Sequence, residues 1–91
     1  MADARVTCIN KPDRFSRHEH ITHLGGSEWK WTREEVIRSI DSRTNTFYVL
    51  DAQGNRSDVG VVDPGGARAR FVRTFADGVW NDNLLALPEC R

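Results

Sequence analysis

One segment of this 91-residue sequence carries several independent signals of an α-helix, and it constrains the fold more than any other. Thr32 stands three residues before Glu35, which is the spacing of a capping box. Trp31 and Val36 flank the same cap at the spacing of a hydrophobic staple, and an apolar stripe follows. These signals predict one helix over residues 33–42.

Short β-rich runs, separated by turn residues, surround the predicted helix. They are rich in valine, isoleucine, threonine and aromatic residues, which favour strands, and they stop at glycine, proline, asparagine or aspartate. The runs are residues 5–10, 20–24, 46–51, 56–63 and 69–75. Their order, ββαβββ, predicts an α+β domain in which one small antiparallel sheet of about five strands packs against one helix.

The end of the sequence predicts an apolar strap across the core. Leu84, Leu85 and Leu87 are large apolar side chains close together, and Pro88 follows them. Left exposed, they would form an apolar patch that a small domain tolerates poorly. Because the chain has room for only one domain with a thin core, we expect residues 1–91 to form one unit that this strap completes.

Charge and hydropathy exclude some classes of function. The chain has 13 basic and 13 acidic side chains, whereas a protein that neutralises several phosphates usually has a basic excess. Nucleic acid is therefore an unfavourable partner. No run approaches the roughly 20 apolar residues that span a bilayer, and no signal peptide is visible, so we expect a cytoplasmic protein without a membrane partner. Thiols stay reduced in that compartment, so Cys8 and Cys90 are expected to be free.

Three stretches of the sequence form a pattern that extends over nearly the whole chain. They are residues 5–10 (RVTCIN), residues 18–26 (HEHITHLGG) and residues 76–90, which begin with ADG and end with NLLALPEC. Together they resemble a family of small, mostly bacterial domains of unknown function. One departure is Asp82, where the resembled pattern has paired asparagines. The resemblance implies a self-contained domain and brings no activity or cofactor with it.

Three histidines form the clearest candidate for a metal-binding cluster. His18, His20 and His23 offer imidazoles, the commonest metal ligands in proteins. In an extended segment His18 and His20 share one face and His23 points away, so a further ligand has to come from elsewhere, such as Cys8 or Cys90. The cluster supports the hypothesis of a zinc-type metal-binding domain or metal-dependent enzyme. The alternative is solvated or core-edge histidines without a cofactor.

Arginines form a second candidate site. Arg56, Arg68 and Arg70 are placed by the predicted strands so that they can form a basic stripe for phosphate or nucleic acid, beside tryptophans that stack on bases. The alternative is that these charges protect the edges of the sheet from aggregation.

No catalytic motif accompanies these residues. The sequence has no serine elbow and no glycine-rich phosphate loop, and Cys8 lies within a predicted strand, where a thiol is usually inert. We therefore expect a non-catalytic binding or interaction domain. A protein partner is favoured, because the sheet offers an edge to which a strand can be added.

Overall fold

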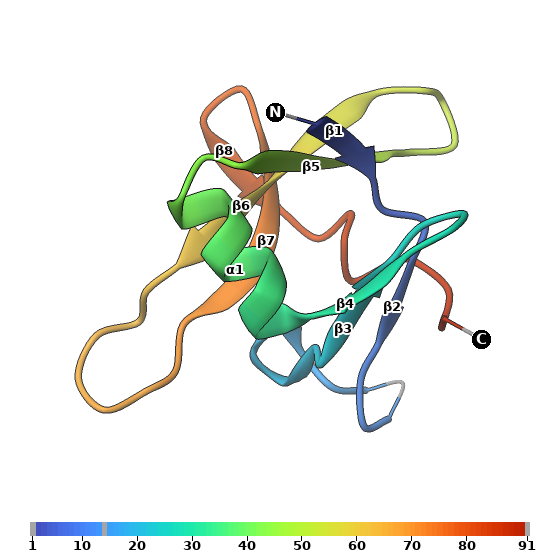
Figure 1. The fold of residues 1–91 in the computed structure, drawn as a ribbon. Helices are drawn as coiled ribbons and strands as arrows, with labels where there is room; N and C mark the ends of the chain where they lie inside the picture. The colour runs from blue at the N-terminus through green and yellow to red at the C-terminus, as the bar shows by residue number, and fades with distance from the viewer. Residues whose placement is uncertain (1, 14, 91) are drawn as a thin grey trace.

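The computed structural model describes residues 2–13 and 15–90, which form two sheets and one α-helix (Figure 1). The elements are β1 (Ala2–Arg5), β2 (Cys8–Asn10), the 3-10 helix η1 (His18–His20), β3 (His23–Gly25), β4 (Lys30–Thr32), α1 (Arg33–Asp41), β5 (Asn45–Leu50), β6 (Arg56–Val62), β7 (Phe71–Ala76) and β8 (Val79–Asn81). One sheet has the order β1-β5-β6-β7-β8 and the other β2-β3-β4. The domain is α+β, as predicted, but its strands belong to two sheets and not to one.

The five-stranded sheet is mixed, whereas the sequence predicts an antiparallel one. β1 runs parallel to β5, from Ala2 opposite Asn45 to Arg5 opposite Tyr48, and the other neighbours are antiparallel. A parallel pair needs a long connection between its strands. Here that connection contains the whole three-stranded sheet and the helix, so no short turn in the sequence announces the pairing.

Residues 5–10, predicted as one strand, contribute to both sheets. The N–H of Val6 donates to the carbonyl of Tyr48 (2.8 Å), and the next N–H, that of Thr7, donates to the carbonyl of Gly25 (2.8 Å). The chain therefore changes partners between two adjacent residues. Because β propensity reports on the pleated environment and not on the partner strand, the sequence gives no sign of this change.

Other short elements also differ from the prediction. Residues 20–24 do not form one strand, because η1 ends at His20 and β3 begins only at His23. The sequence predicts no strand at β4 or at β8, and each has three residues. Strands of this length are too short to show an alternation of apolar and polar residues.

The predicted helix is confirmed together with its cap. The Glu35 N–H donates to the Thr32 hydroxyl (3.1 Å), and the Thr32 N–H donates to the Glu35 carboxylate (3.0 Å). The backbone N–H of Thr32 is the main reason why the pKa of Glu35 lies below its ordinary value. Val36 is buried, and Trp31 packs against the same core.

The core is enclosed by the helix, the three-stranded sheet and one face of the five-stranded sheet. α1 contacts strands of both sheets. Alternate residues of β5, β6 and β7 point into the core, and we call the face that they form the inner face. It consists of Phe47, Val49, Ser57, Val59, Val72 and Thr74, which are all buried.

The C-terminal strap is confirmed. Leu84 is fully buried, and Leu85 and Leu87 pack partly buried against the core. The Leu84 N–H donates to the Thr74 hydroxyl on the inner face (3.1 Å). The strap therefore contributes directly to the core of the domain.

The strap continues beside β2 and forms one isolated parallel bridge to it, between Glu89 and Ile9 (Figure 1). The N–H of Ile9 donates to the carbonyl of Pro88 (3.0 Å), and the N–H of Cys90 donates to the carbonyl of Ile9 (3.0 Å). The strap thus joins the two sheets, because it bonds to β7 at one end and to β2 at the other.

A disulfide joins Cys8 and Cys90, whose Cα atoms are 4.9 Å apart, so the prediction of free thiols is wrong. The reason is the parallel bridge between Ile9 and Glu89, which brings the two cysteines side by side. Gly25 lies opposite Cys8 in β3, and a Cβ atom there would be 2.8 Å from either sulfur. Glycine at this position therefore leaves room for the bridge.

No helix among the described residues is long and apolar enough to cross a membrane.

We predict that thiol titration of the unfolded, untreated protein finds no free thiol and that it finds two after reduction. The bridge has a sequence separation of 82 residues. Closing a loop of this length should contribute about 4.5 kcal/mol to the free energy of unfolding in the chain-entropy model. Chemical denaturation with and without reductant measures this difference, and the Cys8→Ser/Cys90→Ser variant should match the reduced protein. Two reactive thiols in the untreated protein would contradict the structure.

We also predict that Leu84→Ala lowers the free energy of unfolding by about 2–5 kcal/mol, because the residue is fully buried. Leu85→Ala is the matched control and should cost less, since Leu85 is only partly buried. A truncation that removes residues 84–91 should unfold the domain. Thermal melting and the dispersion of amide NMR signals report both effects. Equal stability of the two leucine variants would show that Leu84 does not anchor the strap.

Candidate functional site

The structure separates the three histidines that the sequence groups together. His18 is buried in η1, His20 ends η1 and is exposed, and His23 is half-buried in β3. Cys8 and Cys90, the suggested additional ligands, are bonded to each other. In the described part of the chain, no three His, Cys, Asp or Glu side chains come together in a way that could hold a metal ion.

The structure also separates the three arginines. Arg56 begins β6, whereas Arg68 and Arg70 lie beyond the other end of that strand, in the connection to β7. The predicted strand over residues 69–75 begins later, at Phe71, so neither arginine belongs to the sheet. Arg70 forms an ion pair with Asp41 of α1 (2.8 Å). The predicted basic stripe is therefore not formed.

The face of the five-stranded sheet that points away from the core carries a row of three aromatic side chains and one aspartate. Tyr48, Asp58, Phe75 and Trp80 stand opposite one another on β5, β6, β7 and β8. Side chains paired in this way lie on the same face of a sheet. We call these four residues and Arg56 the outer face. Trp80 is 43% exposed, a large fraction for a tryptophan in a domain with so few core residues.

Phe75 and Trp80 are held in place by their contact across the backbone of Gly60. Their ring centroids are 5.5 Å apart and their planes form an angle of 73°. A Cβ atom on Gly60 would lie 2.9 Å from the Phe75 ring and 3.2 Å from the Trp80 ring. The two rings therefore cover a glycine in the middle of a strand, a place where other groups can approach the backbone closely.

Arg56 links the outer face to β1. Its guanidinium donates to both oxygens of Asp3 (2.7 and 3.1 Å) and to Asp58 (2.8 Å), and it lies 4.3 Å from the centroid of the Tyr48 ring. The bonds from Arg56 are the main cause of the lowered pKa of Asp3, and they raise the pKa of Arg56. Because these side chains are about half exposed, we assign to them a role in fixing orientation more than in stabilising the fold.

A hollow of about 300 Å³ opens beside the outer face. β5 and β6 are paired only from Tyr48 opposite Asp58 to Leu50 opposite Arg56. On the other side of Tyr48 and Asp58 the two strands separate, and the hollow lies there. The residues that line the hollow include Arg56, Asp58 and Phe75 of the outer face and the more deeply placed Ile40, Phe47 and Val59. It offers an apolar floor below a charged rim.

A second hollow, of about 510 Å³, lies at the end of the sheet where the β5–β6 and β7–β8 turns meet. We call it the acidic hollow, because three aspartates and one arginine are among the residues that line it. These are Asp51, Asp58, Asp77 and Arg56. The lining also includes Ser57 and Asn81, which alternate with Asp58 and Trp80 along β6 and β8, so the hollow opens on the side of the sheet opposite to the Trp80 ring.

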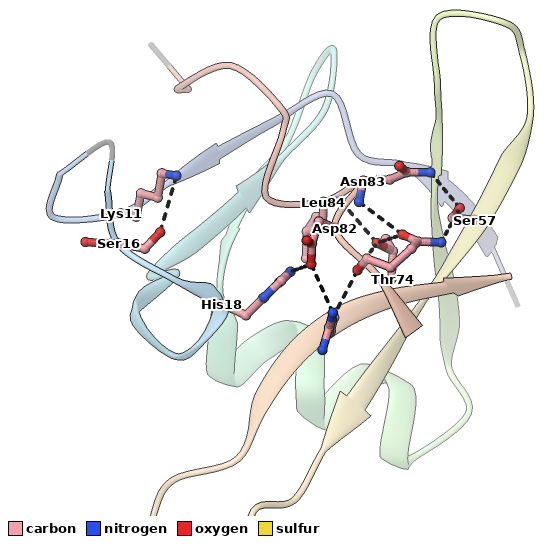
Figure 2. A network of polar contacts seen from close by, with 10 residues as sticks. Lys11, Ser16, His18, Ser57, Thr74, Asp82, Asn83 and Leu84 are labelled. Carbon is pink, nitrogen blue, oxygen red and sulfur yellow. Dashed lines mark hydrogen bonds and ion pairs between the residues drawn. The ribbon is translucent and has the colours of Figure 1, made fainter. Parts of the chain in front are cut away.

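A network of hydrogen bonds beneath the acidic hollow fixes β8 and the strap (Figure 2). The Thr74 hydroxyl donates to the side-chain carbonyl of Asn81 (2.6 Å) and accepts from the Leu84 N–H (3.1 Å). The Ser57 hydroxyl accepts from the side-chain amides of Asn81 (3.0 Å) and Asn83 (2.9 Å). Buried polar groups have to be hydrogen-bonded. These residues therefore have a structural role and hold the outer face in place from behind.

His18 lies at the far end of the same polar region (Figure 2). It is 2% exposed, and its Nε2 has no hydrogen-bond partner and is 3.8 Å from the Asp82 carboxylate. Asp82 is already engaged by Arg73 (3.0 Å). Burial, followed by the charge of Arg73, lowers the pKa of His18 below its ordinary value of 6.5, against the opposing effect of Asp82.

One sequence signal points to the outer face, the aspartate–glycine pair at residues 77 and 78. Asp77 and Gly78 both have positive φ, at 54° and 77°, as a two-residue type I′ hairpin requires. An aspartate–glycine pair between two β-rich runs is a strong signal for this turn. The turn sets Ala76 opposite Val79 and thereby Phe75 opposite Trp80. This register follows from the turn alone.

The fold and its surface define a class: a small α+β domain with two sheets, a C-terminal strap and one open sheet face. The chain belongs to a family of proteins of unknown function, DUF3892, which it matches over residues 5–88. This confirms the resemblance that the sequence shows. No curated protein and no solved structure matches the chain. Membership of the family brings no function with it, so the function has to be argued from the surface.

We predict that the free energy of unfolding falls as the pH is lowered from about 7.5 to 5.5. The unfolded chain binds a proton at His18 more readily than the folded chain, because the folded pKa is depressed, so stability is complete above about pH 6.5 and is lost below it. Arg17, Glu19, Arg73 and Asp82 are the charged groups that act on this ring.

The measurement is denaturant unfolding at a series of pH values. His18→Gln should flatten the dependence in this range, whatever its effect on stability at neutral pH. His20→Gln, which changes an exposed histidine, is the control and should keep the slope of the unchanged protein. An equal slope in both variants would assign the effect to other groups.

Proposed function

We propose that this protein is a non-catalytic protein-binding domain and that the outer face is its contact surface. The observation that carries this proposal is the exposure of Trp80 (43%) on β8, the last strand of the five-stranded sheet. Tryptophan and tyrosine contribute much of the binding energy of protein interfaces. An edge strand also offers backbone groups to which an extended segment of a partner can pair.

The rigidity of the surface supports the same function. β8 follows a two-residue turn, its Trp80 ring packs on Phe75, and the Ser57–Asn81 hydrogen bond holds it from the inner side. A contact surface that is ordered before binding loses less conformational entropy in the complex. The adjacent 300 Å³ hollow can accept an anchoring side chain of the partner.

Phosphate or nucleic-acid binding through Arg56, Arg68 and Arg70 has less support. Arg56 is neutralised by two aspartates, and Arg70 is paired with Asp41. The balanced charge of the chain adds no attraction for a polyanion.

A zinc-type site on His18, His20 and His23 stays an untested prediction. His18 is the only one of the three that is buried, and the disulfide leaves neither cysteine thiol available as a ligand. Elemental analysis of untagged protein tests it directly.

The cytoplasmic location also stays a prediction. The Cys8–Cys90 bridge bears on it, because structural disulfides persist mainly in oxidising compartments. Trapping of free thiols in intact cells, before lysis, distinguishes the two environments.

We predict that Trp80→Ala abolishes binding to partners that the unchanged domain captures from a native lysate. Loss of a central tryptophan at an interface typically weakens binding by at least about tenfold. Phe15→Ala is the matched control, because Phe15 is 80% exposed and lies outside the outer face.

Capture followed by quantitative mass spectrometry compares the three proteins, and amide NMR spectra show whether each remains folded. Partners retained by the control and lost by the β8 variant support the proposal. The same proteins captured by all three would show that the outer face is not the contact surface.

A further inference from the structure

The C-terminal strap is held in the domain by different means at its two ends. Its first part is anchored by burial, because Leu84 is fully buried and its N–H donates to the Thr74 hydroxyl (3.1 Å). Residues 88–90, which we call the strap end, have no buried side chain among them. The hydrophobic effect therefore holds the first part of the strap much more strongly than the strap end.

Apart from the disulfide, the strap end is held on β2 by hydrogen bonds. The Ile9 N–H donates to the Pro88 carbonyl (3.0 Å), and the Ile9 carbonyl accepts from the Cys90 N–H (3.0 Å). The side-chain amide of Asn10 donates to the Cys90 carbonyl (3.2 Å). Hydrogen bonds that few buried apolar contacts support open at low free-energy cost. The covalent bond is therefore the main restraint on the strap end.

The contact between the strap end and β2 is also incompletely packed. A hollow of about 230 Å³ lies between them, lined by Ile9, Leu87, Glu89 and residues 11–13. The side-chain oxygen of Asn10 is buried and has no hydrogen-bond partner among the described residues. A buried polar atom without a partner destabilises the arrangement that buries it. Both features favour departure of the strap end from β2 once the covalent bond is broken.

The bridge lies where a reductant can reach it, since Cys8 and Cys90 are both partly exposed. A thiolate of a dithiol reductant attacks one sulfur of the bridge and forms a mixed disulfide, while the other sulfur leaves as a thiolate and takes up a proton. The second thiolate of the reductant then displaces the remaining cysteine, which is protonated in turn. Two electrons thus pass to the cysteines, and the dithiol becomes a disulfide.

We propose that the Cys8–Cys90 bridge is a redox switch whose reduction releases the strap end from β2 while Leu84 stays in the core. β2 is the first strand of its sheet, so the release uncovers the N–H and the carbonyl of Ile9 at the sheet edge. Natural sheets cover such edges, because unpaired backbone groups attract other extended chains. The segment that fits this edge is the strap end itself, and oxidation closes the switch again. This inference goes beyond the proposed function, because the outer face belongs to the other sheet.

The experiment is amide hydrogen exchange, measured by NMR on the labelled full chain before reduction, after reduction with dithiothreitol and after reoxidation. In the oxidised protein the amides of Ile9 and Cys90 should be protected. In the reduced protein we expect both to exchange within about tenfold of the rate of an unstructured chain, whereas Leu84 and Phe75 stay protected. Reoxidation should restore the protection. Comparison of amides within one reduced sample separates local release from the general loss of stability that the loss of a cross-link causes.

The Cys8→Ser/Cys90→Ser variant is the control for effects of the reductant itself. It should exchange like the reduced protein whether or not dithiothreitol is present. Continued protection of Ile9 and Cys90, in the reduced protein or in this variant, would overturn the inference. So would loss of protection at Leu84 and Phe75 together with the strap end, because the bridge would then hold the whole fold and not one segment.

Discussion

The position of the C-terminal strap between two sheets is the constraint on which the rest of this structure depends. Each sheet alone is too small to enclose a core, since one has three strands of three residues each. The strap supplies the fully buried Leu84 and bonds to Thr74 in one sheet and to Ile9 in the other. The disulfide then fixes the end of the strap to β2. The two sheets also meet through the helix and through the rings of Trp31 and Phe47, whose centroids are 6.0 Å apart.

Local signals in the sequence predict local structure well. The capping box at Thr32 and Glu35 is present in both directions, and the apolar tail packs as the presence of three leucines indicates. In each case the determining interactions are made within a few residues or follow from the exclusion of apolar surface from water. Signals of this kind do not depend on which other helix or strand the segment packs against.

Pairings over long sequence distances could not be predicted in the same way. The parallel contact of β1 with β5 and the bridge of Ile9 with Glu89 depend on the whole path of the chain. The disulfide is a consequence of the second pairing, so the two cysteines could not be linked from their types and positions alone. The histidines and the arginines lie apart for the same reason: their grouping assumed strands that begin and end elsewhere in the structure. The Phe75–Trp80 pair is the exception, because a two-residue turn determines its register.

The network around Ser57 and Asn81 connects stability with the proposed contact surface. Asn81 ends the strand that carries Trp80, and its side chain is bonded both to Thr74 and to Ser57. The same hydrogen bonds that satisfy buried hydroxyls in the core therefore hold the exposed tryptophan at the edge of the sheet. A change in this network would alter the presentation of the outer face before it unfolded the domain.

The covalent link between Cys8 and Cys90 also has a mechanical consequence. Tension that reaches this domain through residues before Cys8 and after Cys90 would run through the sulfur–sulfur bond and leave the 81 residues between them unloaded. The elements from β2 to β8, the helix included, would keep their arrangement under a pull that extends an unlinked domain of the same size. β1 lies before Cys8, so its hydrogen bonds to β5 would carry load. Reduction of one bond would transfer the load to further hydrogen bonds and to the strap. In the oxidised form, the part of the chain between the two cysteines behaves under tension as a short inextensible joint.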